Sequence, residues 1–294
     1  ECGECGGDGN CSITLSIDIA SGWNWFSLNV EGDMSIANVM SSLSSTDGDF
    51  IKNMNLSSTY YDDFGWYGGL EELGVTGMYK FNSANADLLV FSGAPVDPLS
   101  TPIVLSSGWN WLGFLPQNDG PTADALASAI TNDGDFIKNM NLSSTYYDDF
   151  GWYGGLEVMA PTEGYMLSVS EGSVLVYPNF DPDDALSRTK VETVLPATIS
   201  DWTLDYHDYE FNGHITMSID SREDADADYI AAFVGDECRG IAKRMYFPFG
   251  DSYMYSVMVY SNDIEGDELT FRYYDSVSGE IVGYGETINF TSDM

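Results

Sequence analysis

Carboxylate side chains dominate the residues of this 294-residue chain that could do chemistry. The sequence holds 47 Asp and Glu residues against 10 Lys and Arg, for a formal net charge of −37. Hard cations such as Ca²⁺ take six to eight oxygen ligands, which acidic loops often supply. The acidic positions with suitable spacing are Asp47, Asp49, Asp133, Asp135, Asp224, Asp226 and Asp228. Two interpretations stay open: these carboxylates bind calcium, or they are solvated turn residues on an acidic surface.

The last three of these acids alternate along the chain. In extended backbone, alternate side chains point to the same side, so Asp224, Asp226 and Asp228 could converge on one ion. The other four form two pairs with the same internal spacing. No segment fits the EF-hand loop. We therefore expect any calcium site to lie in an irregular acidic loop, and the sequence implies no other cofactor.

Aromatic residues form two groups with the same spacing: Tyr60, Tyr61, Trp66 and Tyr67, then Tyr146, Tyr147, Trp152 and Tyr153. Exposed aromatic side chains give a large contact area at low entropic cost, and such platforms commonly stack on sugar rings. Small β domains also bury Trp and Tyr as a main part of their cores. We expect Trp66 and Trp152 to lie in the core. Adjacent strand residues face opposite sides, so one tyrosine of each pair is expected to be exposed.

Three of the four cysteines, Cys2, Cys5 and Cys11, lie near the start of the chain, and Cys238 stands alone far from them. Their even number allows three disulfide connectivities. The glycines between the first three permit tight turns, as in a small disulfide-stapled loop. A zinc site built on Cys2 and Cys5 is the alternative, although no histidine lies near. Cys238 is either a disulfide partner or a buried free thiol.

Sequence patterns typical of catalysis are missing. The chain contains no GxSxG, HExxH, P-loop or GxGxxG motif. A serine-type triad would need one of the two histidines, His207 or His214, and both are expected to be solvated surface residues. With 47 acids, a pair of carboxylates resembling that of a glycosidase arises easily by chance. We therefore predict that the protein is not an enzyme.

The charge balance also limits the partners. Binding nucleic acid or an anionic membrane requires cations that neutralise phosphates, and this chain has few. Its longest apolar run, Tyr229–Val234, has the length of a strand and is far shorter than a membrane-spanning helix. The sequence predicts neither nucleic-acid binding nor membrane insertion.

An internal repeat is the strongest pattern in the sequence. Asp47–Glu71 and Asp133–Glu157 are identical, and the register extends in both directions at a constant offset of 86 residues. Prolines mark the expected joints between segments. We predict a cysteine-rich segment 1–11, repeat modules 12–97 and 98–183, a linker 184–194 and a β-sandwich domain 195–294.

The apolar periodicity indicates a mainly β chain. Each repeat opens with an alternating strand, Trp23–Val30 in the first copy. The spacing of Ile36, Val39, Met40 and Leu43 predicts a short helix, and strand-like runs follow it. After residue 195, alternation in His214–Ile219, Ser252–Tyr260 and Glu268–Tyr274 indicates short strands joined by turns. The predicted fold is two tandem α+β (mostly β) repeat modules followed by an Ig-like β-sandwich.

Several motifs resemble those of large secreted and cell-surface proteins of marine Bacteroidetes-type bacteria. The segment Glu1–Cys11 resembles the end of their CGxCGGDGxxC cysteine-rich repeats. Gly22–Val30, Asp49–Asn53, Gly65–Gly68 and Met78–Lys80 resemble their tandem modules. Phe211–Ile215, Ala232–Gly240 and Met258–Asn262 resemble a β domain found beside those modules. The resemblance implies export by a type IX secretion system and an extracellular or cell-surface location, and we expect the chain to be a piece of a longer protein. It implies no catalytic residues.

Two functions follow as expectations. The first is an extracellular structural or adhesive protein, including a subunit that polymerises through its repeated surfaces, with itself or other surface proteins as partners. The alternative is a pair of carbohydrate-binding modules that gain avidity from two copies, with glycans as partners. Exposed aromatic platforms favour the second function, whereas burial of the same residues between molecules favours the first.

Overall fold

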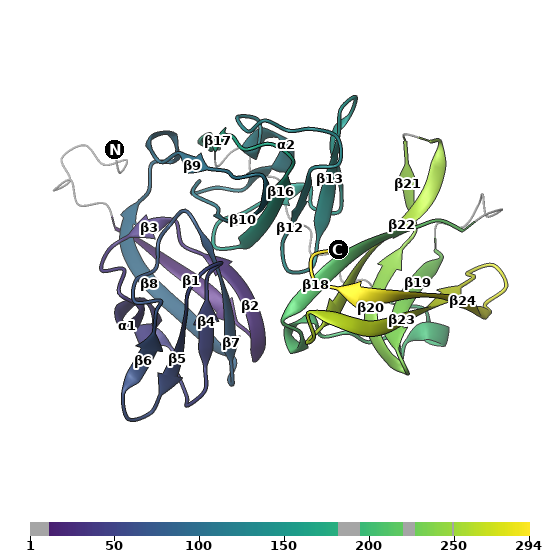
Figure 1. Ribbon diagram of the computed structural model, residues 1–294, viewed down its shortest axis with the longest axis horizontal. Coiled ribbons are helices and arrows are strands. Elements are labelled where there is room, and N and C mark those ends of the chain that lie inside the picture. Colours follow the sequence, from purple (N-terminus) through teal and green to yellow (C-terminus); the bar gives the residue numbers. More distant parts are fainter. Residues whose placement is uncertain (1–11, 182–194, 220–226, 249) are drawn as a thin grey trace. The chain divides into compact units, whose positions relative to one another are not determined.

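The computed structural model of the protein describes residues 12–181, 195–219, 227–248 and 250–294 (Figure 1). The chain divides into two compact units, Glu1–Arg188 and Thr189–Met294. Both repeats belong to unit 1, and unit 2 holds the C-terminal region. The division falls within the linker predicted at 184–194, which lies outside the described residues, as does the cysteine-rich segment 1–11.

The predicted mainly β fold class is confirmed, with 50% of the structure in strands and 8% in helices. Every strand pair in the described residues is antiparallel. The strands of unit 1 are β1 (Ile13–Ile19), β2 (Gly22–Ser27), β3 (Val30–Glu31), β4 (Phe50–Lys52), β5 (Ser57–Tyr61), β6 (Gly65–Gly68), β7 (Met78–Ser83), β8 (Asp87–Pro95), β9 (Ile103–Val104), β10 (Gly108–Gly113), β11 (Gly120–Pro121), β12 (Phe136–Lys138), β13 (Ser143–Tyr147), β14 (Gly151–Gly154), β15 (Val158–Met159), β16 (Gly164–Val169) and β17 (Val174–Leu175). The strands of unit 2 are β18 (Phe211–Met217), β19 (Tyr229–Val234), β20 (Glu237–Lys243), β21 (Met245–Phe247), β22 (Ser252–Ser261), β23 (Glu265–Tyr274) and β24 (Ile281–Thr291).

The first repeat is built on a five-stranded sheet in the order β2-β7-β4-β5-β6 and a three-stranded sheet in the order β1-β8-β3. Alternation along the strands sends one set of apolar side chains into a shared core. That core includes Phe26 from β2, Ile51 from β4, Phe81 from β7 and Leu89 from β8. The alternating pattern of the opening strand therefore predicted its buried face.

The second repeat has the same five-stranded sheet, in the order β10-β16-β12-β13-β14. Its second sheet is reduced to the two-residue strands β9 and β17. Its core gathers side chains equivalent to those of the first repeat, such as Ile137 from β12 and Leu167 from β16. The identical block thus forms three adjacent strands of the larger sheet in both copies.

A glycine and an asparagine shape the start of each large sheet. Gly22 and Gly108 have φ of 91° and 92°, a conformation that glycine adopts without steric cost. Asn24 then closes the turn, since its side chain accepts a hydrogen bond from Ala20 N (2.8 Å) and donates one to Ala20 O (2.9 Å). Asn110 repeats both bonds with Ser106. The shared Gly-Trp-Asn-Trp motif is therefore a turn-and-strand signal.

The helices are shorter than the sequence pattern predicts. α1 (Ile36–Val39) and α2 (Thr122–Ala125) have four residues each, and a 3-10 segment, Met40–Ser42, continues α1. Ile36, Val39 and Met40 are buried, as the spacing predicts. β-branched residues and serines are weak helix formers, so the segment makes only one α-helical turn.

The two repeats pack against each other about an approximate two-fold axis within unit 1. Ser27 N donates to Thr162 O (3.0 Å), and Gly113 N donates to Thr76 O (3.0 Å). Ser27 and Gly113 are equivalent positions of the two repeats, and so are Thr76 and Thr162. Each repeat therefore donates the same hydrogen bond to the other, which makes the contact isologous. An isologous contact closes on itself, so this surface does not continue from repeat to repeat in a chain of modules.

Tryptophans, methionines and a lysine fill the contact between the repeats. Trp25, Met78 and Met166 are buried there, with Trp109 and Trp111 packed against them. The Lys80 Nζ atom lies 4.3 Å from the ring centroid of Trp25 and 5.0 Å from that of Trp111. A cation between two aromatic faces is attracted by both ring quadrupoles. Lys80 therefore links one tryptophan from each repeat.

Unit 2 is a β-sandwich of the sheets β18-β22-β21 and β20-β19-β23-β24. Its core lies between the sheets, with Ile215, Val257 and Val259 from the first facing Phe271 and Phe290 from the second. On the other face of the second sheet, the segment before β18 packs Trp202 against Phe233, with ring centroids 5.6 Å apart. The predicted strands at 214–219, 252–260 and 268–274 correspond to β18, β22 and β23.

Candidate functional site

The duplicated block presents the same β-hairpin twice, as β5–β6 and β13–β14. Tyr60 lies opposite Trp66 in the first hairpin, and Tyr146 lies opposite Trp152 in the second. Each hairpin is the outer edge of its five-stranded sheet, because β6 and β14 pair on one side only. The two edges therefore carry identical side chains in identical register.

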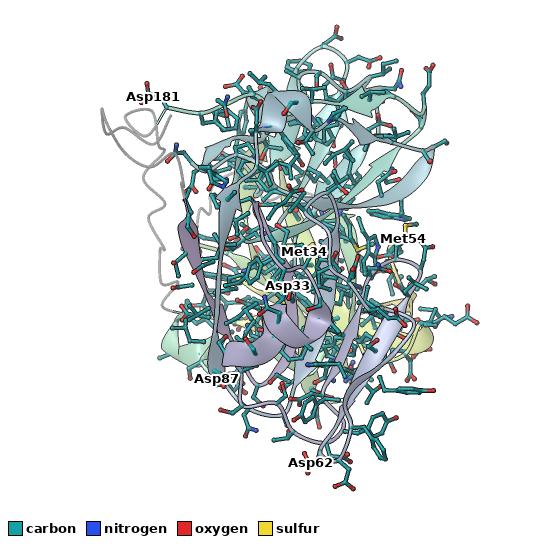
Figure 2. All side chains as sticks on the ribbon, turned by 90° about the vertical axis from the view of Figure 1, so that its left-hand side faces the viewer. Asp33, Met34, Met54, Asp62, Asp87 and Asp181 are labelled. Atoms are coloured by element: carbon teal, nitrogen blue, oxygen red, sulfur yellow. The ribbon has the colours of Figure 1, made fainter. Side chains whose placement is uncertain are left out.

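A tight turn brings charged and aromatic side chains to the tip of the hairpin. Phe64 N donates to Tyr61 O (3.0 Å), and Gly65 follows with φ of 74°. The loop has the three residues 62–64, and the left-handed Gly65 follows it as the first residue of β6. Figure 2 shows Asp62 at the outer end of this loop. Phe64, two residues farther along the loop, is 84% exposed.

The two faces of the first hairpin differ in burial. Tyr60 and Trp66 face the core, with ring centroids 5.5 Å apart, and Trp66 also packs against Phe81. Tyr61 and Tyr67 lie on the opposite face, where Tyr67 is 76% exposed. The hairpin thus presents an exposed surface of Tyr61, Phe64 and Tyr67, which we name the aromatic surface.

The second hairpin has the same arrangement with less exposure. Tyr146 and Trp152 have ring centroids 5.5 Å apart, and Trp152 packs against the core of its repeat. Phe150 at the tip is 61% exposed, whereas Tyr147 and Tyr153 are half-buried. The equivalent aromatic surface is therefore Tyr147, Phe150 and Tyr153. Phe64 and Phe150 were not among the aromatic residues selected from the sequence, although their place in a Tyr-Asp-Asp-Phe-Gly turn is the signal that could have identified them.

Two of the acidic residues considered for calcium, Asp49 and Asp135, stabilise turns within their repeats through hydrogen bonds. The Asp49 carboxylate is buried and accepts hydrogen bonds from Thr46 N (2.9 Å) and Ala84 N (2.8 Å). Asp135 accepts the equivalent two bonds in the second repeat. Asp47 and Asp133 are exposed beside them. These bonds give Asp49 and Asp135 a structural role in the turn before each hairpin.

The remaining acidic candidates lie in unit 2. Asp228 is buried, and its carboxylate accepts hydrogen bonds from the Tyr273 hydroxyl, Ser276 N (2.8 Å) and Ser276 Oγ (2.6 Å). Asp224 and Asp226 lie outside the described residues. Within the described part of the chain, no group of three His, Cys, Asp or Glu side chains could hold a metal ion. Calcium binding stays a prediction.

Cys238 is a free cysteine within the described residues, and its thiol is buried. Burial raises the pKa of this thiol, because the thiolate would lose its hydration. It packs beside Trp202 and Phe233 on the outer face of the second sheet of unit 2. Cys2, Cys5 and Cys11, the other disulfide candidates, lie outside the described residues. The buried-thiol interpretation of Cys238 fits this position.

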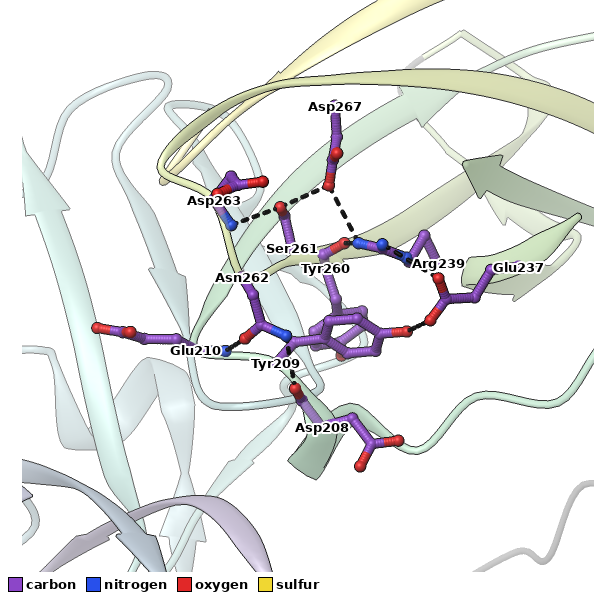
Figure 3. Close-up of polar contacts among 10 residues, drawn as sticks. All are labelled: Asp208, Tyr209, Glu210, Glu237, Arg239, Tyr260, Ser261, Asn262, Asp263 and Asp267. Carbon is purple, nitrogen blue, oxygen red and sulfur yellow. Dashed lines mark hydrogen bonds and ion pairs between the residues drawn. The ribbon is translucent and has the colours of Figure 1, made fainter. Parts of the chain in front are cut away.

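A polar cluster in unit 2 was not anticipated from the sequence (Figure 3). The Arg239 guanidinium pairs with Asp267 (3.1 Å) and Glu237 (3.2 Å), and lies 4.8 Å from the Tyr209 ring centroid. Tyr209 donates its hydroxyl to Glu237 at 2.5 Å, and Ser261 donates to Asp267 at 2.7 Å. The cluster joins the segment before β18 to β20, β22 and the start of β23. Its ion pairs and hydrogen bonds hold these segments together, so the cluster acts as a structural clamp.

Acid should weaken this clamp. The Tyr209 hydrogen bond, followed by Arg239, lowers the pKa of Glu237 below its ordinary value. A carboxylate with a lowered folded-state pKa contributes stability above its unfolded pKa and loses it as the pH falls through the folded pKa. We expect Glu237→Gln to destabilise unit 2 at pH 7 and the difference from wild type to disappear below the folded pKa of Glu237. Urea unfolding between pH 7 and pH 3 measures this effect.

The matched control for this prediction is Glu268→Gln, which neutralises an exposed acid on β23. If the two variants show the same stability difference from wild type at every pH, the clamp does not contribute in this way.

Comparisons with protein-family models, with curated proteins and with solved structures find no match to this chain. Every helix within the described residues is too short or too polar to span a bilayer.

Proposed function

We propose that this protein is a non-catalytic extracellular adhesive protein that holds carbohydrate through the two aromatic surfaces of its repeats. The observation that carries the proposal is the outward face of the duplicated hairpin, where Tyr67 is 76% exposed while its neighbour Trp66 packs on the core. Exposed tyrosines on a strand give a rigid contact surface, since few rotatable bonds must be fixed on binding. The extracellular location rests on the sequence resemblance.

The surroundings of each aromatic surface suit a neutral sugar. Asp62 and Asp63 precede Phe64 in the turn, and both are exposed. Carboxylates accept hydrogen bonds from hydroxyl groups, which sugars carry in abundance. A ring face beside hydrogen-bond acceptors therefore matches the apolar face and polar edge of a pyranose.

Two copies of one surface on a single compact unit favour a polymeric ligand. Both repeats lie in unit 1, and the isologous contact between them fixes the two hairpins relative to each other. Once one surface is bound, the second binds at a high effective concentration. Weak binding to a single sugar can then give firm attachment to a polysaccharide.

The proposal is tested with a glycan array and the variants Tyr67→Ala, Tyr153→Ala and the double variant. We expect each single variant to retain one weak site and lose avidity, by on the order of 100-fold on a dense glycan surface. The double variant is expected to lose binding. Val104→Ala, which truncates another exposed side chain of unit 1, is the matched control and should bind as wild type does.

Binding by the double variant at the wild-type level would contradict the proposal, as would the absence of binding to any glycan. Assembly of a polymer through the repeated surfaces is the competing function. It predicts that Tyr67 becomes protected between molecules as the protein concentration rises. Negative-stain electron microscopy of the same samples would then show fibres that the double variant does not form.

A further inference from the structure

The aromatic surface of the first repeat continues across the five-stranded sheet. Tyr67 of β6 lies opposite Thr59 of β5, which lies opposite Phe50 of β4. Phe50 in turn lies opposite Asn82 of β7. Directly opposed residues of antiparallel strands point to the same face of a sheet. The four side chains therefore form one line across four neighbouring strands, which we name the cross-strand row.

The cross-strand row is accessible, and its second ring is held in place. Tyr67 is 76% exposed, and the other three side chains are half-buried. Trp23 of β2, which lies opposite Asn82, is buried and packs edge to face against Phe50, with ring centroids 6.2 Å apart. This contact orients the Phe50 ring, so little further conformational freedom is lost when a ligand binds to it.

The second repeat has an equivalent cross-strand row. Its members, again one on each of four neighbouring strands, are Tyr153, Thr145, Phe136 and Ser168. All four side chains are half-buried. Trp109 packs against Phe136 with ring centroids 6.2 Å apart, as its counterpart does in the first repeat. Unit 1 therefore contains the same arrangement twice.

The two rings of the row have the spacing of an extended sugar chain. Neighbouring strands lie about 4.8 Å apart, so Tyr67 and Phe50, which are two strands apart, are separated by about 10 Å. This separation is close to the span of two linked pyranose units in an extended β-linked chain. A chain that lies across the strands can stack one unit on Tyr67 and, two units farther on, another on Phe50. The intervening unit faces Thr59, whose hydroxyl group can exchange hydrogen bonds with sugar hydroxyls.

The charges on this face favour an uncharged ligand. Residues 12–181 contain 21 Asp and Glu against three Lys, yet none of the ten strands in the two five-stranded sheets contains an acid. A cationic polymer therefore finds no carboxylate along the row. Lys52, which is half-buried on the same face over the Trp23 ring, is a single cation, and the net charge of −37 repels an anionic polymer.

We propose that each cross-strand row binds an extended, uncharged, β-linked polysaccharide whose chain runs across the strands. The proposal rests on the carbohydrate binding proposed above, and it adds the class of glycan and the direction of the chain. It also gives binding roles to Phe50 and Phe136, which lie on the central strands β4 and β12 rather than on the hairpin. Such a site selects its ligand by length, because a disaccharide reaches only one ring of the row.

Isothermal titration calorimetry with cellobiose and cellotetraose tests this dependence on length. The measurements use the Tyr153→Ala variant, which leaves the row of the first repeat as the intact site. We expect cellotetraose to bind about ten-fold more tightly than cellobiose, the gain from one further aromatic contact. Maltotetraose, whose α-linked chain coils, should bind no more tightly than cellobiose.

The test variant adds Phe50→Leu, which removes the ring but keeps an apolar side chain of similar volume. We expect it to lose the roughly ten-fold gain for cellotetraose and to bind cellobiose unchanged through Tyr67. Circular dichroism should show the fold of the parent protein. The matched control, Leu88→Ala, truncates an exposed apolar side chain on β8 of the other sheet and should keep the gain.

Three outcomes would overturn the cross-strand row while leaving glycan binding through Tyr67 intact. They are equal affinities for cellobiose and cellotetraose, an undiminished gain in the Phe50→Leu variant, and tighter binding of polygalacturonate, an anionic chain, than of cellotetraose. Self-association that Phe50→Leu abolishes would assign the row to a second copy of the chain instead. Absence of binding to any glycan on the array would overturn the proposed function as well, so the two failures are distinguishable.

Discussion

Asp228→Ala is expected to cost unit 2 about 3–5 kcal/mol of unfolding free energy, the range for removing one member of a buried polar network. Asp228 is fully buried just before β19, where its carboxylate accepts hydrogen bonds from Tyr273 of β23 and from Ser276 in the following turn. Its main-chain oxygen also accepts from Arg244 N (3.1 Å). The substitution leaves the buried Tyr273 hydroxyl and the half-buried donors of Ser276 without this acceptor, and the lost hydrogen bonds are the main cost.

Urea unfolding followed by circular dichroism measures this loss. Asp228→Asn keeps one acceptor oxygen in the same volume and should cost clearly less than alanine. Asp236→Ala is the matched control, since its fully exposed side chain pairs with Arg272 on the surface, where such pairs contribute little to stability. Equal losses for Asp228→Ala and Asp236→Ala would contradict the structural role of Asp228.

The same unfolding experiment distinguishes two roles of Asp228, as a structural hydrogen-bond acceptor or as a calcium ligand. If the Asp228 carboxylate acts through Tyr273 and Ser276, removing calcium with a chelator should not reproduce the effect of Asp228→Ala. If it acts as a calcium ligand, chelation of the wild type should lower its stability and Asp228→Ala should no longer respond to calcium.

Local periodicity was enough to predict much of the fold. Phe26 and Leu28 alternate with Trp25, and the structure places the first two in the core and Trp25 on the opposite face. The turn-and-strand motif around Asn24 also depends only on neighbours in sequence, because its hydrogen bonds reach no farther than Ala20 and Gly22 apart from one long contact to Phe81. Features of this kind are encoded within a few residues.

Features that join distant segments could not be predicted. The Arg239 clamp links residues as far apart as Tyr209 and Asp267, so it exists only once the strands of the sandwich are in register. The pattern that identified Asp228 as a calcium candidate was its spacing from other acids, whereas its partners lie 45 to 48 residues away. Periodicity likewise cannot predict the contact between the repeats, because it joins residues as far apart in the sequence as Ser27 and Thr162.

Gly113→Ala should destabilise the contact between the repeats by about 2–3 kcal/mol, the cost of forcing an extra methyl group into a packed interior. A Cβ atom at Gly113 would lie 2.2 Å from Val75 O and 3.0 Å from Gly77 O. Both are backbone atoms of the other repeat, so they cannot turn aside as a flexible side chain would. Relief requires the repeats to separate, which stretches the hydrogen bond from Gly113 N to Thr76 O.

The two-fold equivalent of Gly113 is Ser27, so the two halves of the contact are not identical. Ser27 Oγ donates to Glu163 O at 2.6 Å, so the first repeat has a polar side chain at the position where the second has no room for a Cβ. Gly74→Ala is the matched control, because its nearest neighbour would be the Tyr79 hydroxyl at 3.8 Å. Thermal unfolding followed by tryptophan fluorescence compares the variants.

This substitution also connects the fold to the proposed adhesion. The avidity of two aromatic surfaces depends on a fixed spacing between them, which the contact between the repeats provides. Gly113→Ala should therefore weaken attachment to a polysaccharide while each surface still binds a short oligosaccharide as in the wild type. A stable Gly113→Ala protein would contradict the predicted steric cost. An unstable one that keeps its full avidity would show that the two surfaces do not act as a rigid pair.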